Sequence, residues 1–215
     1  MDENLKKYSL LKYQNVSRET FKDFESFISL VQKKNEEINI ISKETAKNEI
    51  IRERHIIDSA QIIEFIDLNH TKLVDIGSGS GMPGIVISIM IKNLRKSTKV
   101  YLYEKSHHKS VFLKKVSREL DLKTEVIQEN IFKAQNLQSG TIMTRAFKPL
   151  PVVLDLVYKN FDNYKNLILF MGKNGEKILE ETLKDWDFDF ETKKSITSKD
   201  SFFLNIKNIK KKNKN

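Results

Sequence analysis

A glycine-rich turn directly after an apolar strand constrains the fold of this chain more than any other stretch. Residues 73–84 read L-V-D-I-G-S-G-S-G-M-P-G, with glycines at every second position from 77 to 81. Glycine adopts left-handed backbone angles freely, so this pattern predicts a tight turn. The residues before it predict a buried strand, and the apolar run 84–91 predicts a helix. Strand, glycine turn and helix together are typical of a nucleotide-type binding site.

Two kinds of ligand suit such a turn. Residues 79–84 fit G-x-G-x-x-G, the dinucleotide pattern in which a helix N-terminus receives a pyrophosphate. The longer pattern, an acidic residue and three alternating glycines, resembles the first motif of S-adenosylmethionine-dependent methyltransferases with a Rossmann-like sheet. That resemblance assigns these residues to the donor site: Asp75, Gly77, Gly79, Gly81 and Met82. A plain turn is the third interpretation, which three alternating glycines among only seven disfavour.

Composition restricts the class of protein. The chain has 215 residues, enough for one full-sized core or a core domain with an extension. No apolar run approaches the roughly 18 residues of a membrane-spanning helix, and none near Met1 could serve as a signal peptide. The absence of Cys excludes disulfides and thiolate metal sites, and the four His form no helical metal-binding pair. We therefore expect a cytoplasmic protein without metal or membrane partner. A monomer is a separate expectation, on which the sequence carries no signal.

From residue 71 onward, strand patterns alternate with helical ones. Strands are expected at 73–76, 100–103, 123–128, 141–144 and 166–171, and a closing antiparallel hairpin at 186–192 and 201–206. This alternation predicts an α/β fold of the Rossmann-like class I methyltransferase type, a mostly parallel seven-stranded sheet flanked by helices. A helix is expected at 107–120, with Val111, Phe112 and Val116 facing inward.

The chain divides into three parts by pattern. Residues 1–70 predict an N-terminal helical extension, with amphipathic helices over about 18–36 and 43–67. Residues 71–206 are expected to form the core domain. The Lys/Asn-rich residues 207–215 predict an unstructured tail.

Basic residues concentrate in one span. The net charge is +9, and residues 92–123 contain ten Lys or Arg against three Asp or Glu. Such a span attracts a phosphate backbone, although a solvated lysine-rich face is the alternative interpretation. The residues expected to contact RNA phosphates lie on one strand-to-helix unit: Lys105, Lys109, Lys114, Lys115 and Arg118.

Two further candidate residues lie at the carboxyl ends of expected strands, where sheets of this type bind ligands. Glu104 ends the second strand, where its carboxylate could accept hydrogen bonds from both hydroxyls of a ribose. Arg145 follows the fourth strand and could bind a donor carboxylate, a substrate phosphate or the O6 edge of a guanine. A surface Glu, and an Arg paired with an Asp for structure, are the alternatives.

Four segments together resemble the glucose-inhibited division protein B family, bacterial methyltransferases of guanine N7 in small-subunit ribosomal RNA. They are Asn39–Ser42, the R-H-I-I-D-S of Arg54–Ser59, the glycine turn, and the T-R-A-F of Thr144–Phe147. The R-H-x-x-D-S segment combined with the turn is the specific signal. The resemblance implies S-adenosyl-L-methionine as cofactor and guanine 527, in the 530 loop of 16S ribosomal RNA, as target, in naked RNA or in the small ribosomal subunit.

The resemblance also implies roles for single residues. It makes Arg145 both a catalytic and a donor-binding residue. The family's R-x-E-E after the third strand is replaced by Asn130–Lys133, which leaves the backbone of Ile131 and the ring of Phe132 to contact the adenine. Guanine N7 carries a lone pair and no proton, so its methylation depends on alignment rather than on a general base. The rival functions are an NAD-linked oxidoreductase and a non-enzymatic basic RNA-binding or ribosome-assembly module.

Overall fold

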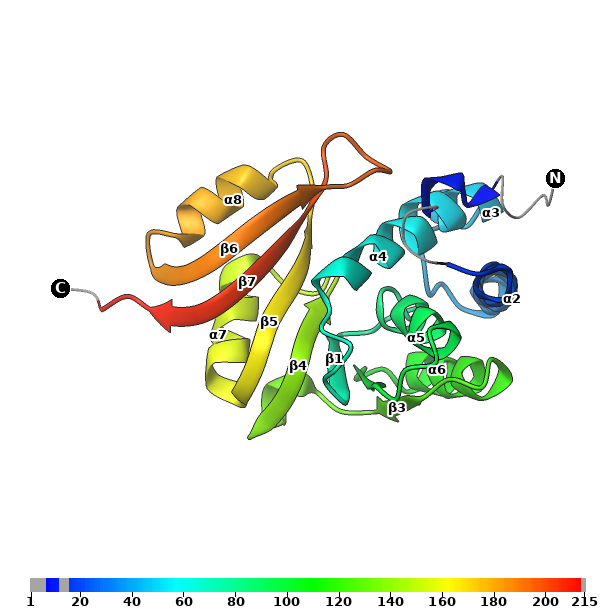
Figure 1. Cartoon of the computed structure of the whole chain (residues 1–215), viewed down its shortest axis with the longest axis horizontal. Coiled ribbons are helices and arrows are strands. Elements are labelled where there is room, and N and C mark those ends of the chain that lie inside the picture. Colours follow the sequence, from blue (N-terminus) through cyan, green and yellow to red (C-terminus); the bar gives the residue numbers. More distant parts are fainter. Residues whose placement is uncertain (1–6, 12–15, 214–215) are drawn as a thin grey trace.

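The sheet predicted from the strand pattern is present, in a computed structural model that describes residues 7–11 and 16–213 (Figure 1). Its order is β3-β2-β1-β4-β5-β7-β6, and β7 runs in the opposite direction to the other described strands. The strands are β1 (Lys72–Ile76), β2 (Lys99–Tyr103), β3 (Thr124–Ile127), β4 (Leu137–Thr144), β5 (Phe161–Met171), β6 (Trp186–Lys194) and β7 (Phe202–Lys211). The carboxyl ends of β1 to β5 therefore share one edge.

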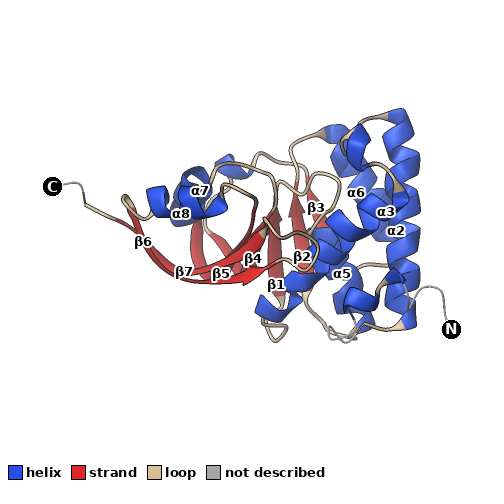
Figure 2. Ribbon diagram, turned by 90° about the horizontal axis from the view of Figure 1, so that it is seen from above, coloured by secondary structure: helices blue, strands red, loops and turns tan. Residues whose placement is uncertain are grey.

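Helices cover both faces of this sheet, as the alternation along β1 requires. Leu73 packs with α5 (Gly84–Asn93) and α6 (His107–Glu119), whereas Val74 packs with α7 (Leu150–Asn160) on the other face. Successive side chains of a strand point to opposite faces, so each strand supplies two cores. Figures 1 and 2 show α7 and α8 (Gly175–Thr182) on the opposite side of the molecule from α5 and α6.

The N-terminal segment completes one of these cores. Its long helix α2 (Arg18–Glu37) starts at a capping box, in which Ser17 Oγ accepts the N–H of Thr20 at 3.2 Å. Phe24 and Phe27 of α2 are fully buried in the same cluster as the residues of α5. The predicted extension therefore shares the core of the sheet domain.

The second N-terminal helix is irregular. It consists of α3 (Asn48–Ile51), a π-helical turn (Arg52–Ile57), α4 (Asp58–Ala60) and a 3-10 turn (Gln61–Phe65). Further 3-10 turns cover Ser9–Leu11, Lys43–Thr45 and Ile131–Lys133. No helix within residues 7–11 and 16–213 is long and apolar enough to cross a bilayer.

Two expectations are wrong. The Lys/Asn-rich tail was expected to begin at 207, but β7 pairs with β6 as far as Lys211, and Ile209 is buried. Asn208 has a φ of +56°, which interrupts the alternation of side chains, so the pattern does not look like a strand. In α6, Val111 is 48% exposed, and Leu113 takes the inward position instead.

Candidate active site

The three glycines of the turn all have left-handed backbones, with φ of +69°, +58° and +95° at Gly77, Gly79 and Gly81. The space beside each glycine is occupied differently. A Cβ at Gly77 would lie 2.3 Å from the ring of Phe147, and one at Gly81 would lie 2.6 Å from Ile85. A Cβ at Gly79 would meet nothing nearer than a backbone oxygen at 3.7 Å. Gly79 is therefore the turn glycine that leaves space for a ligand.

Asp75 lies beneath the turn rather than beside a ligand. It is 1% exposed, and its Oδ2 accepts the N–H of Gly84 at 3.1 Å, which ties the start of α5 to β1. Burial raises the pKa of this carboxyl to about 7. Asp75 does not line the adjacent cavity, and its bond to Gly84 helps to shape the turn. A contact between Asp75 and the donor stays a prediction.

A cavity of about 460 Å³ opens at the carboxyl edge of the sheet, where the ligand site was expected. The turn, the ends of β2, β3 and β4, and two N-terminal residues, Ile40 and His55, line it. Among the predicted site residues, those in the lining are Gly77, Gly79, Met82, Glu104, Lys105, Lys109, Ile131 and Arg145. Those outside it are Asp75, Gly81, Lys114, Lys115, Arg118 and Phe132.

Glu104 is fixed against the turn. Its Oε2 accepts the N–H of Gly79 at 2.9 Å, and its Oε1 accepts the N–H of Ser106 at 2.8 Å. The residue is only 8% exposed, so these bonds hold the carboxylate in one orientation. Each carboxylate oxygen keeps a further lone pair, which leaves Glu104 able to accept two hydroxyl groups from the cavity.

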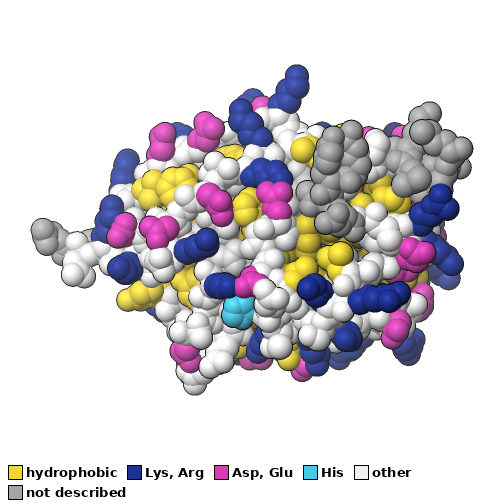
Figure 3. All heavy atoms as spheres, viewed as in Figure 1, with side chains coloured by type: hydrophobic (Ala, Val, Ile, Leu, Met, Phe, Trp, Pro, Cys, Tyr) yellow, Lys and Arg dark blue, Asp and Glu magenta, His cyan; other side chains and the backbone are white. Residues whose placement is uncertain are grey.

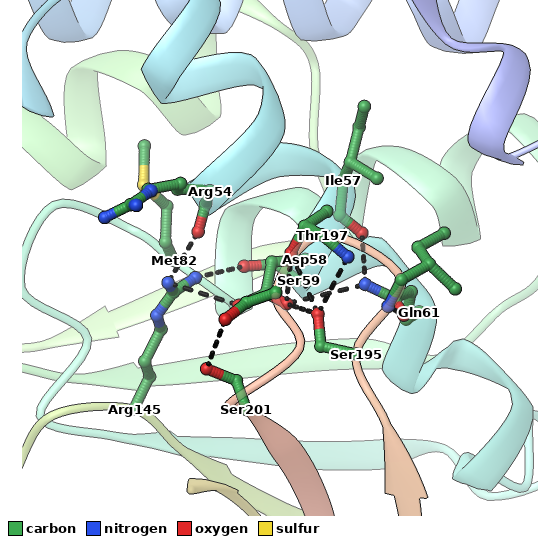
Figure 4. A network of polar contacts seen from close by, with 12 residues as sticks. Arg54, Ile57, Asp58, Ser59, Gln61, Met82, Arg145, Ser195, Thr197 and Ser201 are labelled. Carbon is green, nitrogen blue, oxygen red and sulfur yellow. Dashed lines mark hydrogen bonds and ion pairs between the residues drawn. The ribbon is translucent and has the colours of Figure 1, made fainter. Parts of the chain in front are cut away.

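Arg145 is held by the R-H-I-I-D-S segment (Figure 4). Its Nη2 donates to the carbonyl oxygen of Arg54 at 2.5 Å and lies 3.3 Å from Oδ2 of Asp58. Its guanidinium carbon lies 5.1 Å from the ring centroid of Phe170. Burial lowers the pKa of Arg145, yet an arginine stays charged at any physiological pH. The predicted alternative, an Arg paired with an Asp, is present, and the same Arg also lines the cavity.

Asp58 binds a third part of the chain, which no sequence pattern indicated. Its Oδ1 accepts the hydroxyls of Ser195 at 2.7 Å and Thr197 at 3.0 Å, in the loop 195–201 between β6 and β7. Gln61 Oε1 accepts the N–H of Ile196 at 2.9 Å. Figure 4 shows these groups converging from the N-terminal segment, β4 and the hairpin loop. One carboxylate thus positions both Arg145 and this loop.

Aromatic and imidazole groups lie in the cavity wall or beside it, with Phe147 and His55 in the lining and Phe132 next to it. Phe132 and Phe147 stack with ring centroids 5.9 Å apart, and Phe132 is 42% exposed. Ala146, before Phe147, has a φ of +48°, a strained value that aims the ring over Gly77. His55, which sequence reasoning missed, has a buried Nε2 that finds no hydrogen-bond partner in the part of the chain that the structure describes. Its burial, then the nearby arginines, lower its pKa to about 4.

The basic span of residues 92–123 lies only partly near the cavity. Lys105 and Lys109 line it, whereas Lys115 lies further along the helix and pairs with Glu119 at 3.7 Å. On the face shown in Figure 3, Lys and Arg side chains are interspersed with Asp and Glu rather than gathered into one block. RNA contact by Lys114, Lys115 and Arg118 stays a prediction.

Comparison with known proteins identifies the family of this chain. The family model GidB, described as rRNA small subunit methyltransferase G, matches residues 20–206. The chain belongs to this family. A ribosomal RNA small subunit methyltransferase G of Pelagibacter ubique is 74% identical over 213 residues, 99% of this chain and 100% of that protein. Another member, from Rickettsia felis, is 35% identical over 196 residues, 91% and 97% of the two chains. The resemblance stated from the sequence is confirmed.

Solved structures outside the family share the fold. A SAM-dependent methyltransferase from Aquifex aeolicus has a TM-score of 0.53 at 14% identity, covering 70% of this chain and 89% of that one. The 16S rRNA methylase RmtB has a TM-score of 0.51 at 9% identity, covering 87% and 75%. At such identities the likeness concerns architecture alone, and it agrees with the predicted Rossmann-like methyltransferase fold.

Proposed function

We propose that this protein transfers a methyl group from S-adenosyl-L-methionine to N7 of guanine 527, in the 530 loop of 16S ribosomal RNA. Membership in the rRNA small subunit methyltransferase G family supports the coarser statement, methylation of small-subunit ribosomal RNA. The choice of N7 and of this nucleotide follows from the resemblance of the R-H-I-I-D-S segment and the glycine turn. We expect the protein to act in the cytoplasm as a monomer.

The hydrogen bond between Gly79 and Glu104 is the observation that carries the proposal. It places a fixed carboxylate with free lone pairs beside the one turn glycine that faces open space. A ribose diol fits this carboxylate, and Gly79 lets the rest of the donor approach the backbone. The neighbouring Ile131 and Phe132 suit an adenine, the first in the cavity wall and the second exposed beside it. The bound donor supplies an electrophilic methyl group.

The acceptor side needs positioning rather than proton transfer. Guanine N7 has an in-plane lone pair and no proton, so its methylation requires no base. Guanine presents O6 beside N7 on the same edge, and a guanidinium is a good donor to O6. Arg145 stands in the cavity wall with its guanidinium held by Asp58 and Arg54, which suits it to fix a guanine with N7 free.

Three measurements test this function. Titration calorimetry should show binding of S-adenosylhomocysteine that NADH does not displace. Single-turnover assays with labelled donor should methylate unmodified 16S ribosomal RNA or unmodified small subunits, and mass spectrometry should place the group on N7 of guanine 527. Displacement by NADH would support an oxidoreductase instead. RNA binding without either small ligand would support a binding module, and a methyl group elsewhere would refute the assigned target.

A further inference from the structure

A second cavity, of about 510 Å³, lies at the same edge of the sheet, between α8 and the ends of β6 and β7. It begins at Gly172, directly after β5, and continues to the loop 195–201. We call it the hairpin groove; its lining includes Lys173, Phe190, Lys194, Lys199 and Phe202. Figure 1 shows the hairpin loop reaching toward α4, the element that carries Asp58.

Asp58 links the hairpin groove to the donor cavity. Asp58 holds the loop through Ser195 and Thr197, and it holds Arg145 in the wall of the donor cavity. Arg145 also lies over Phe170, two residues before the groove begins. A polymer whose target nucleotide sits at Arg145 would therefore have its next nucleotides beside the hairpin groove.

The side chains of the groove suit single-stranded RNA. Phe190 is 45% exposed, and an exposed aromatic ring is a stacking surface for a base of any identity. Lys173, Lys194 and Lys199 are exposed, and none of them forms an ion pair with another described residue. Glu176, Glu180 and Asp200 share the lining, which limits the number of phosphates that the groove can hold. A contact with a few nucleotides fits this balance.

We propose that the hairpin groove binds the single-stranded RNA segment that flanks the methylated nucleotide. Lys194 and Lys199 contact its phosphates, and Phe190 stacks on one of its bases. This inference rests on the proposed function, and it places part of the RNA site on the hairpin, away from the basic span of α6.

The test compares each variant of the groove with a variant that removes similar side chains elsewhere on the surface. Lys194→Ala/Lys199→Ala is compared with Lys207→Ala/Lys210→Ala, at the far end of β7. Phe190→Ala is compared with Tyr158→Ala, which removes an aromatic ring on α7 that is 52% exposed, against 45% for Phe190. RNA affinity is measured by fluorescence anisotropy over a salt series, with the unmodified 16S ribosomal RNA or small subunit that the parent methylates.

Phosphate contacts release counterions, so the Lys194/Lys199 variant should lower the salt slope by about 1.4 and weaken binding about tenfold near physiological salt. Phe190→Ala should weaken binding about tenfold at every salt concentration and leave the slope unchanged, because stacking releases no counterions. The two control variants should bind like the parent. Equal slopes in both lysine variants together with parent-like binding by Phe190→Ala would overturn the inference. If the parent itself methylates neither substrate, the proposed function fails first.

Discussion

Asp58 holds Arg145 with one carboxylate oxygen and the β6–β7 loop with the other. The Oδ2 atom lies 3.3 Å from the guanidinium, and the Oδ1 atom accepts the hydroxyl of Ser195 at 2.7 Å. Asp58 is only 7% exposed, so water does not compete effectively for either contact. The carboxylate of Asp58 therefore sets the position of Arg145, in the wall of the donor cavity, and of the β6–β7 loop, in the wall of the hairpin groove.

Asp58→Asn should lower the single-turnover rate of methylation about 10- to 100-fold, because it removes a charged hydrogen-bond acceptor worth roughly 1.5–3 kcal/mol from Arg145. The amide oxygen can still accept a bond from Ser195. Calorimetry should find a smaller loss of affinity for S-adenosylhomocysteine than the loss of rate, since Glu104 and Gly79 are untouched. Asp155→Asn, which breaks an exposed pair with Lys159, is the matched control and should be silent. A normal rate in Asp58→Asn would show that the pair does not position Arg145.

Gly79→Val should abolish measurable donor binding while the protein remains folded. The valine would occupy the space beside the cavity and would strain a backbone whose φ is +58°, at a cost on the order of 1–3 kcal/mol. Gly172→Val is the control, since a Cβ there meets nothing within 4 Å. Circular dichroism checks the fold, and calorimetry checks binding. Parent-like affinity in Gly79→Val would place the donor elsewhere.

Glu104→Ala should weaken binding of S-adenosylhomocysteine by roughly 1.5–3 kcal/mol, because charge-assisted bonds to the ribose are lost. It should also lower the melting temperature, since the N–H groups of Gly79 and Ser106 lose their acceptor. Glu104→Gln keeps a carbonyl oxygen and should be milder on both counts. If all three proteins bind the ligand equally, Glu104 serves only the turn.

His55 should make the fold sensitive to acid. Its pKa in the folded protein is about 4, below the ordinary value near 6.5, so the unfolded chain binds the proton more readily. The free energy of unfolding is therefore unaffected by His55 above about pH 6.5. As the pH falls from there toward 4, the free energy of unfolding decreases by about 3 kcal/mol in all. Urea unfolding of the parent and of His55→Gln over this range measures the difference between the two curves. Parallel curves would show that His55 is accessible to solvent.

Local patterns were sufficient to predict the sheet and the position of the cavity. The apolar run before Gly77 and the alternate glycines indicate β1, the turn and α5 without reference to the rest of the chain. Glu104 was predicted because it ends the second strand, at the edge where a carboxylate could accept hydrogen bonds from both hydroxyls of a ribose. The order of the predicted strands then brings these residues to one edge, which the parallel pairing of β1 with β2 and β4 confirms.

Contacts between distant segments could not be predicted in the same way. Nothing in the spacing of Asp58, Arg145 and Ser195 indicates that they meet, because an ion pair leaves no periodic signal in a sequence. The orphaned Nε2 of His55 depends on burial by neighbours from other elements. Asp75 resembled a ligand-binding residue because its position in the motif is the same whether its oxygens face a ligand or the N–H of Gly84.

The order of the strands bears on when the protein can first become active during its own synthesis. β7 leaves the ribosome after β6, yet it lies between β5 and β6 in the finished sheet. Among residues 7–11 and 16–213, β6 pairs only with β7, so it has no partner in this sheet until β7 emerges. The loop between β6 and β7, which Asp58 binds through Ser195, can reach its place only when β7 pairs with β6. A nascent chain that has already folded β1 to β5 thus completes this edge of its sheet only after β7 has emerged.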